Sequence, residues 1–151
     1  MIWHKPYTVA ELQWMLKGTL GGHLGIEYTA ITDNSIEATM PVDQRTHQPF
    51  GICHGGAYVA LGEELGSLAS FLTVNPEHFI GVGVEINANH VKAVRSGKVK
   101  GICSPVHVKG KTHVWDIKLY DEAGDLCSVC RFTCQIVPRK SIDLKMPNLA
   151  D

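Results

Sequence analysis

Residues Gln48–Ser67, QPFGICHGGAYVALGEELGS, hold a proline turn, a His-Gly-Gly and an apolar stretch interrupted by two adjacent carboxylates. Apolar side chains at helical spacing predict a helix over about residues 57–72, through Leu61, Leu65, Leu68, Ala69 and Leu72. A helix this apolar is expected to be buried, and a buried carboxylate is costly unless it is paired, hydrated or neutralised. Glu63 and Glu64 therefore need an explanation.

Strand patterns flank this helix on both sides. We predict strands at Ile26–Thr32, Ile36–Val42, Gly81–Asn89, Gly97–His107, His113–Tyr120 and Leu126–Val137. Near the start of the chain, Thr8 and Glu11 have the spacing of a capping box and predict a short helix to about Lys17. One long apolar helix among sequential antiparallel strands indicates an α+β fold, in which a curved antiparallel sheet wraps around that helix.

Composition and charge exclude several classes of protein. The chain has 151 residues, 44% hydrophobic and 19% charged, which suits a globular domain with a sizeable core. We expect one domain over residues 1–137 and a poorly ordered tail over residues 138–151. A net charge of −1 gives no indication of a nucleic-acid partner. No apolar run approaches a membrane span and the first residues lack a signal core, so we expect a cytoplasmic protein.

The chain contains five cysteines, of which Cys127, Cys130 and Cys134 have a spacing similar to that of a metal cluster. On a strand, however, Cys130 and Cys134 share one face and Cys127 lies on the other, so the three thiols do not converge. We therefore expect no metal site, and interpret the cysteines as reduced packing residues.

Chemistry is expected where the helix begins. A helix N-terminus offers free N–H groups and the positive end of the dipole, and glycines there allow a ligand to approach closely. Glu63 lies two turns from His54 and Gly55, about the separation that a small acyl group would fill. Gly55 N–H could polarise a carbonyl while Glu63 attacks it or activates water, with Gln48 holding the water or the carboxylate. The alternatives are an exposed acidic stripe, a structural histidine and a tight turn.

The motifs MPVDQRTHQPFGICHGG, GEELGS, VEINANHV and SGKVKG resemble those of the hot-dog-fold acyl-CoA thioesterases, over nearly the whole chain to about Val137. The nearest branches are the bacterial 1,4-dihydroxy-2-naphthoyl-CoA hydrolases of menaquinone biosynthesis and the proofreading thioesterases of enterobactin synthesis. The resemblance implies the hot-dog fold, no cofactor, and a homodimer or homotetramer with active sites at the subunit interface.

The resemblance also implies roles for individual residues. Glu63 is the expected nucleophile or general base, and Gly55 the backbone donor. Gln48 and His54 are expected to orient the reacting groups, and Ser67 to come from the partner's helix. Coenzyme A contacts are implied for Gly83, His90, Val91, Lys92, Ala93, His107, Val108, Lys109, Gly110, Lys111 and Thr112. Two departures from the family pattern are Glu64, where relatives have a small polar residue, and Tyr58, where they have a small one.

Together these features predict hydrolysis of an aroyl-CoA thioester such as 1,4-dihydroxy-2-naphthoyl-CoA. Two alternatives remain open from the sequence. The first is a proofreading thioesterase that acts on an acyl or aryl carrier protein. The second is a module that binds acyl-CoA without hydrolysing it, which would tolerate the loss of Glu63.

Overall fold

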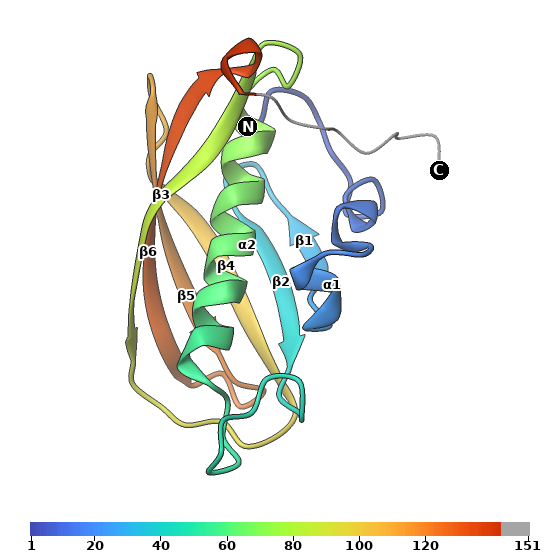
Figure 1. Cartoon of the computed structure of the whole chain (residues 1–151), viewed down its shortest axis with the longest axis vertical. Helices are drawn as coiled ribbons and strands as arrows, with labels where there is room; N and C mark the ends of the chain where they lie inside the picture. The colour runs from blue at the N-terminus through green and yellow to red at the C-terminus, as the bar shows by residue number, and fades with distance from the viewer. Residues whose placement is uncertain (143–151) are drawn as a thin grey trace.

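A six-stranded antiparallel sheet and one long helix make up most of the computed structural model, which describes residues 1–142 (Figure 1). The strands follow the order β1-β2-β4-β5-β6-β3 across the sheet. Their bounds are β1 Glu27–Ile31, β2 Ile36–Pro41, β3 Phe79–His90, β4 Lys98–His107, β5 Thr112–Tyr120 and β6 Leu126–Pro138. The predicted α+β class and all six predicted strands are confirmed.

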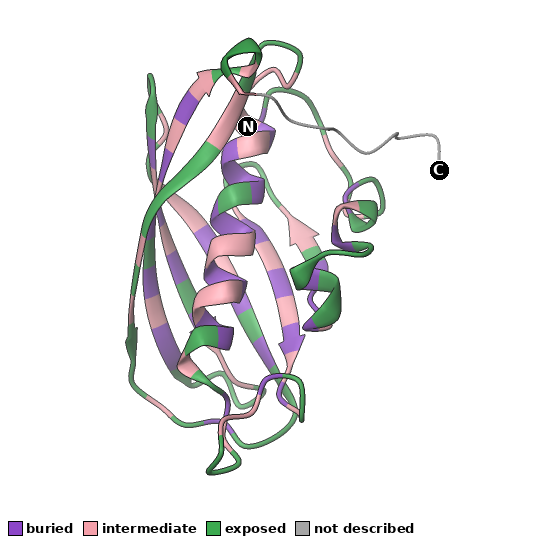
Figure 2. Ribbon diagram, in the orientation of Figure 1, coloured by how far each residue is buried: buried purple, intermediate pink, exposed green. Residues whose placement is uncertain are grey.

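The long helix α2, Gly55–Thr73, lies along the concave face of the sheet (Figure 1). Its buried face meets side chains from the inward face of the strands, such as Met40, Trp115 and Phe132, which have no exposed surface (Figure 2). Helix and sheet approach closely at Gly66, where an added Cβ would lie 2.3 Å from the Phe132 ring. The apolar spacing in the sequence thus marks the face of α2 that the sheet covers.

The predicted N-terminal helix takes a different form. The capping box is present, because Thr8 N–H donates to the Glu11 carboxylate at 2.7 Å. The chain then forms turns and a 3₁₀ helix, η1 Gln13–Leu16, and the short helix α1 follows at Leu20–His23. Leu12 and Leu16 are both buried, and the turns and the 3₁₀ helix hold this N-terminal segment against the core. The predicted short helix does end near Lys17, but it is a 3₁₀ helix that begins at Gln13, and turns separate it from the capping box.

The two edges of the sheet differ. β1 is a five-residue edge strand, whereas the twelve-residue β3 pairs with β6 on one side and, within residues 1–142, leaves its other side unpaired. Val82 and Val84 on β3 are 38% and 64% exposed. A long exposed edge with apolar side chains is a surface on which another strand can pair.

The C-terminal part of the chain remains ordered beyond the predicted domain end. β6 extends to Pro138, and a 3₁₀ turn, η2 Arg139–Ser141, follows it, with Arg139 donating to the Pro76 carbonyl at 3.0 Å. The rest of the predicted tail, residues 143–151, lies outside the described residues. Within residues 1–142 no helix is long and apolar enough to cross a membrane.

All five cysteines are free and buried. The strand β6 carries Cys127, Cys130 and Cys134, which are at most 1% exposed and belong to the hydrophobic core. Burial raises the pKa of each of these three thiols. Among residues 1–142 no group of three or more His, Cys, Asp or Glu is placed to hold a metal ion.

Candidate active site

The first turn of α2 leaves one backbone donor free. His54 is the N-cap, and its Nδ1 accepts a hydrogen bond from Gly56 N–H at 2.8 Å. The His54 carbonyl accepts from Ala57 N–H at 2.9 Å. Gly55 N–H has no hydrogen-bond partner within residues 1–142. Of the two glycines, Gly55 therefore presents the available N–H, at the positive end of the helix dipole.

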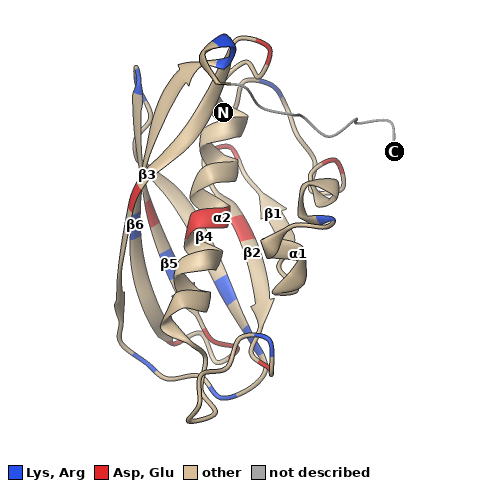
Figure 3. Cartoon of the chain, viewed as in Figure 1, with Lys and Arg blue, Asp and Glu red and all other residues tan. Residues whose placement is uncertain are grey.

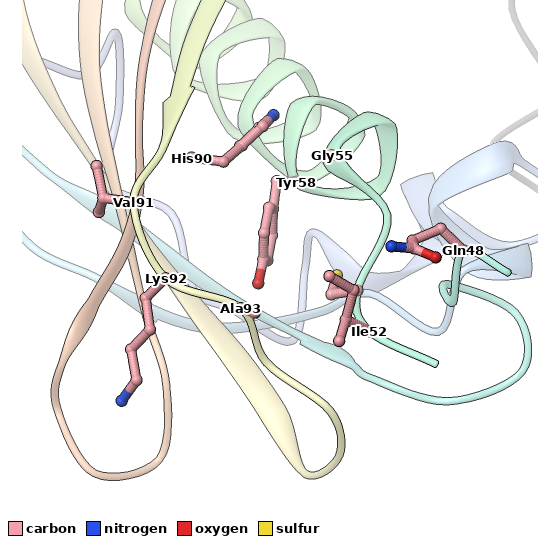
Figure 4. Close-up of a pocket in the computed structure, with 9 residues that line it drawn as sticks. Gln48, Ile52, Gly55, Tyr58, His90, Val91, Lys92 and Ala93 are labelled. Atoms are coloured by element: carbon pink, nitrogen blue, oxygen red, sulfur yellow. The ribbon is translucent and has the colours of Figure 1, made fainter. Parts of the chain in front are cut away.

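This donor opens into a hollow of about 360 Å³, which we call the amide hollow (Figure 4). The residues that line it are Gln48, Ile52, Cys53, Gly55, Tyr58, His90, Val91, Lys92 and Ala93. Gln48, Gly55 and His90–Ala93 among them were predicted as site residues from the sequence. His90 lies against the helix start, and an added Cβ at Gly55 would lie 2.7 Å from its Nε2. Only a glycine fits at this position without displacing the imidazole.

Cys53 and Tyr58 also line the amide hollow, and the sequence assigns neither of them a catalytic role. Burial raises the pKa of the Cys53 thiol to about 11, so it remains protonated at neutral pH and is a poor nucleophile. Tyr58 is 2% exposed, and its ring packs against His90 with a centroid distance of 5.3 Å. Its hydroxyl is buried without a hydrogen-bond partner in the part of the chain described here. Both residues shape the wall of the hollow.

The cations expected to meet coenzyme A are divided between two places. Lys92 lies at the amide hollow, where its ammonium pairs with Asp121 at 2.5 Å and Asp125 at 2.6 Å, and these contacts raise its pKa. Lys109 and Lys111 are exposed on the β4–β5 loop. This loop adjoins the C-terminal end of α2, since His113 contacts Thr73, whereas the amide hollow lies at its N-terminal end (Figure 1). One chain does not bring the two groups together.

Glu63 and Ser67 lie in a second hollow, of about 300 Å³, on the outer face of α2; we call it the acid hollow. Its lining follows one stripe of the helix and one residue of α1: Leu20, Gly56, Val59, Ala60, Glu63, Glu64 and Ser67. The Glu63 carboxylate leans towards β3, where an added Cβ at Gly83 would lie 2.7 Å from its Oε1. Gly83, predicted to contact coenzyme A, thus gives room to this carboxylate.

The Glu63 carboxylate accepts no hydrogen bond from residues 1–142 and is only partly buried. It lies about 12 Å from Gly55 along the helix axis, at about 1.5 Å of rise per residue. A helical side chain leans back towards the N-terminus, which shortens this gap. Neighbouring residues in the first turn of α2 line the two hollows, Gly55 the amide hollow and Gly56 the acid hollow. A thioester lying across this turn is therefore offered an N–H donor and a free carboxylate.

Glu64 differs from its neighbour, because its Oε1 accepts a hydrogen bond from the Tyr28 hydroxyl at 2.5 Å. Tyr28 belongs to β1, which lies 36 residues earlier in the chain. Neither an exposed acidic stripe nor any local sequence pattern predicts this contact. Figure 3 shows acidic residues, in red, in the middle of α2.

Comparison with known proteins agrees with this fold. Residues 50–128 match the family model of the thioesterase superfamily. The chain belongs to this superfamily and has its hot-dog fold, and the prediction of an acyl-CoA thioesterase, a thioester hydrolase, is confirmed.

Individual relatives cover almost the same part of the chain. A 1,4-dihydroxy-2-naphthoyl-CoA hydrolase from Escherichia coli K12 is 47% identical over 137 residues, which are 91% of this chain and 100% of the relative. The proofreading thioesterase EntH from Cronobacter turicensis is also 47% identical, over 91% of this chain and 99% of its own. The crystal structure of thioesterase HI1161 from Haemophilus influenzae superposes with a TM-score of 0.88 at 43% identity, covering 91% of this chain and 96% of that one.

Proposed function

We propose that this thioesterase hydrolyses aroyl-CoA thioesters, such as 1,4-dihydroxy-2-naphthoyl-CoA in menaquinone biosynthesis in the cytoplasm. The observation that carries the proposal is a free N–H at Gly55 and a free carboxylate at Glu63, presented along one helix. The similarity to a hydrolase of that substrate supports the choice of acyl group.

In the proposed reaction, Gly55 N–H donates to the thioester oxygen and stabilises the negative charge that develops there. Glu63 either attacks the carbonyl carbon, giving an anhydride that water hydrolyses, or takes a proton from an attacking water. On either route the carbon–sulfur bond breaks, and coenzyme A leaves as a thiolate that is then protonated. The acyl group leaves as a carboxylate, and no metal or organic cofactor takes part.

The remaining residues orient these groups. Gln48 lines the amide hollow beside Gly55 and is placed to hold the thioester or the attacking water. His54 caps the helix, which fixes the direction of the Gly55 N–H. Ser67 lies one turn beyond Glu63 in the acid hollow and offers a hydroxyl to the water or the acyl ring.

We propose a two-fold homodimer through β3, and the placement of the residues implied to contact coenzyme A supports it. Gly83 and His90–Ala93 lie on or beside β3, and the loop His107–Thr112 lies at the other end of the sheet. Antiparallel pairing of two β3 edges would bring the loop of one chain towards the amide hollow of its partner. The site would then lie at the subunit interface, and two such dimers could form a tetramer. A solution mass equal to one chain would contradict this arrangement.

A second candidate function is the proofreading hydrolysis of thioesters on an acyl or aryl carrier protein. The equal identity to a proofreading thioesterase supports it. Both functions use the same chemistry on a pantetheine thioester, and they differ in the partner that presents it. Comparing kcat/KM for one aroyl group on coenzyme A and on a carrier protein separates them.

The test of the proposal is release of free thiol from a panel of acyl-CoA thioesters by the wild-type protein, Glu63→Gln and Glu63→Ala. We expect hydrolysis of aroyl-CoA by the wild type and a loss of about 10²–10⁴-fold in kcat in both variants, because the attacking or proton-accepting oxygen is gone. A fully active Glu63→Ala would contradict the assignment. Coenzyme A binding without turnover of any substrate would indicate a non-catalytic binding module.

A further inference from the structure

The pairing of Glu64 with Tyr28 fixes a second carboxylate beside the proposed catalytic one. Tyr28 is 3% exposed, and its hydroxyl donates to Glu64 Oε1 at 2.5 Å. The other oxygen, Oε2, lies over α1, where an added Cβ at Gly21 would come within 3.0 Å of it. Glu64 is thus held from β1 and α1, on the side of α2 opposite to the β3 residue that Glu63 approaches.

In this pair the Tyr28 hydroxyl is the hydrogen-bond donor and the Glu64 carboxylate is the acceptor. Burial, and then the charge of Glu64, raise the pKa of Tyr28, so its hydroxyl stays protonated and can only donate towards the carboxylate. An ionised carboxylate has about four lone-pair sites for hydrogen bonds, and Tyr28 occupies one. Glu64 also lines the acid hollow, and within residues 1–142 its second oxygen, Oε2, accepts no hydrogen bond.

Among residues 1–142, the lining of the acid hollow includes no balancing cation. Two of its lining residues, Glu63 and Glu64, carry carboxylates, and the others are apolar, glycine or serine. Like charges brought together in a partly desolvated hollow repel strongly, and a site built to accept hydrogen bonds favours ligands that donate them. The anionic phosphates of coenzyme A are therefore expected to lie away from the acid hollow, and the acyl group to lie in it.

We infer that Glu64, held by Tyr28, selects the acyl group: the acid hollow accepts acyl groups with a hydroxyl or other hydrogen-bond donor and rejects those with a carboxylate. This inference rests on the proposed hydrolysis of aroyl-CoA, and it adds a residue that determines specificity. Glu63 acts on the thioester, and Glu64 reads the substituents on the acyl group.

The experiment compares three substrates: benzoyl-CoA, para-hydroxybenzoyl-CoA and para-carboxybenzoyl-CoA. For each variant, kcat/KM on the two substituted substrates is divided by kcat/KM on benzoyl-CoA, so that losses common to all substrates cancel. In Glu64→Gln, we expect the ratio for the carboxylated substrate to rise about tenfold or more and the ratio for the hydroxylated one to fall several-fold, because the charge is removed while the shape is kept. Tyr28→Phe, which releases Glu64, should shift both ratios in the same directions by less.

Glu27→Gln is the matched control. Glu27 neighbours Tyr28 on β1 but points to the other face, where it pairs with Lys98 at 3.2 Å, and its neutralisation changes the net charge equally. Its two ratios should equal those of the wild type. If Glu64→Gln does not fold, Tyr28→Phe carries the test.

The outcomes separate the inference from the proposed function. Hydrolysis of benzoyl-CoA by the wild type, with ratios unchanged in Glu64→Gln and in Tyr28→Phe, would overturn the selecting role of Glu64 and leave the proposed function standing. A wild-type protein that hydrolyses none of the three substrates would overturn the proposed function, and the inference with it.

Discussion

The two halves of α2 use polar residues in opposite ways. In the N-terminal half, Gly55 N–H and the Glu63 carboxylate face hollows and have no partners within residues 1–142. In the C-terminal half, Ser70 is completely buried, and its Oγ accepts a hydrogen bond from Trp115 Nε1 at 2.8 Å. One turn later, the Thr73 hydroxyl contacts the buried His113 ring at 3.3 Å.

This difference separates groups kept for a ligand from groups kept for the fold. A buried polar atom is stabilising only when it is hydrogen-bonded, so the satisfied Ser70 and Thr73 are compatible with a core. The unsatisfied groups of the first turns are tolerated because they reach a hollow open to water or substrate. Substitutions of the groups that face a hollow should therefore change activity, and substitutions of the buried, hydrogen-bonded groups should change stability.

The largest expected effect that sharpens this comparison is at Gly55. Proline is tolerated at the first position of a helix and lacks only the N–H, and the preceding His54 already has the extended backbone that proline requires. Gly55→Pro thus removes the proposed donor while keeping the helix start. We expect kcat for an aroyl-CoA to fall about 10²–10³-fold, as on removal of one donor to a developing oxyanion.

Gly55→Ala is the control, because it adds the same Cβ beside His90 but keeps the N–H. The displaced imidazole, 2.7 Å from the added Cβ, is expected to reduce kcat/KM in both variants. Equal kcat values for the alanine and proline variants would show that the N–H contributes nothing to the reaction.

How far the sequence predicts this fold depends on how local each signal is. The apolar spacing around Leu61 and Leu65 and the alternation of the strands are local patterns, and they place α2 and all six strands to within about two residues at each end. The capping box at Thr8 is equally local, but the burial of Leu12 and Leu16 against the core determines whether a regular helix follows it. Tertiary packing replaced that helix with turns and a 3₁₀ helix.

The same distinction applies to the site. The His54-Gly55 start and Glu63 are visible because they lie on one helix, and helical geometry fixes their separation. The contact between Tyr28 and Glu64 joins residues 36 apart, and nothing in either local sequence encodes it. The division of the predicted coenzyme A residues between opposite ends of the sheet is likewise a consequence of topology alone.

An intermediate effect is expected in the second half of α2. Ser70→Ala leaves the Trp115 N–H buried without an acceptor, which should lower the free energy of unfolding by about 1–3 kcal/mol. Urea denaturation measures this change. The catalytic rate of the folded variant should stay near that of the wild type, because Ser70 lines neither hollow.

Ser67→Ala, on the same helix, is the exposed counterpart of Ser70→Ala and serves as its control. Ser67 is exposed, so its loss should change the free energy of unfolding by less than about 0.5 kcal/mol. If Ser70→Ala proved as stable as Ser67→Ala, the buried hydroxyl would not be structural, and the division of α2 into two halves would fail.

The smallest expected effect is the pH dependence that His113 gives to stability. Burial, and then the nearby His107, lower the pKa of His113 below its ordinary value of 6.5. In the folded chain the ring is therefore neutral at a pH where the unfolded chain already binds a proton. Stability from this residue is complete above about pH 6.5 and declines as the pH falls from there towards the lowered pKa of the folded state. Urea midpoints measured across this range should fall more steeply for the wild type than for His113→Gln. Parallel curves would mean that the ring accepts a proton in the folded state as readily as in the unfolded one, and that the Thr73 contact does not keep it neutral.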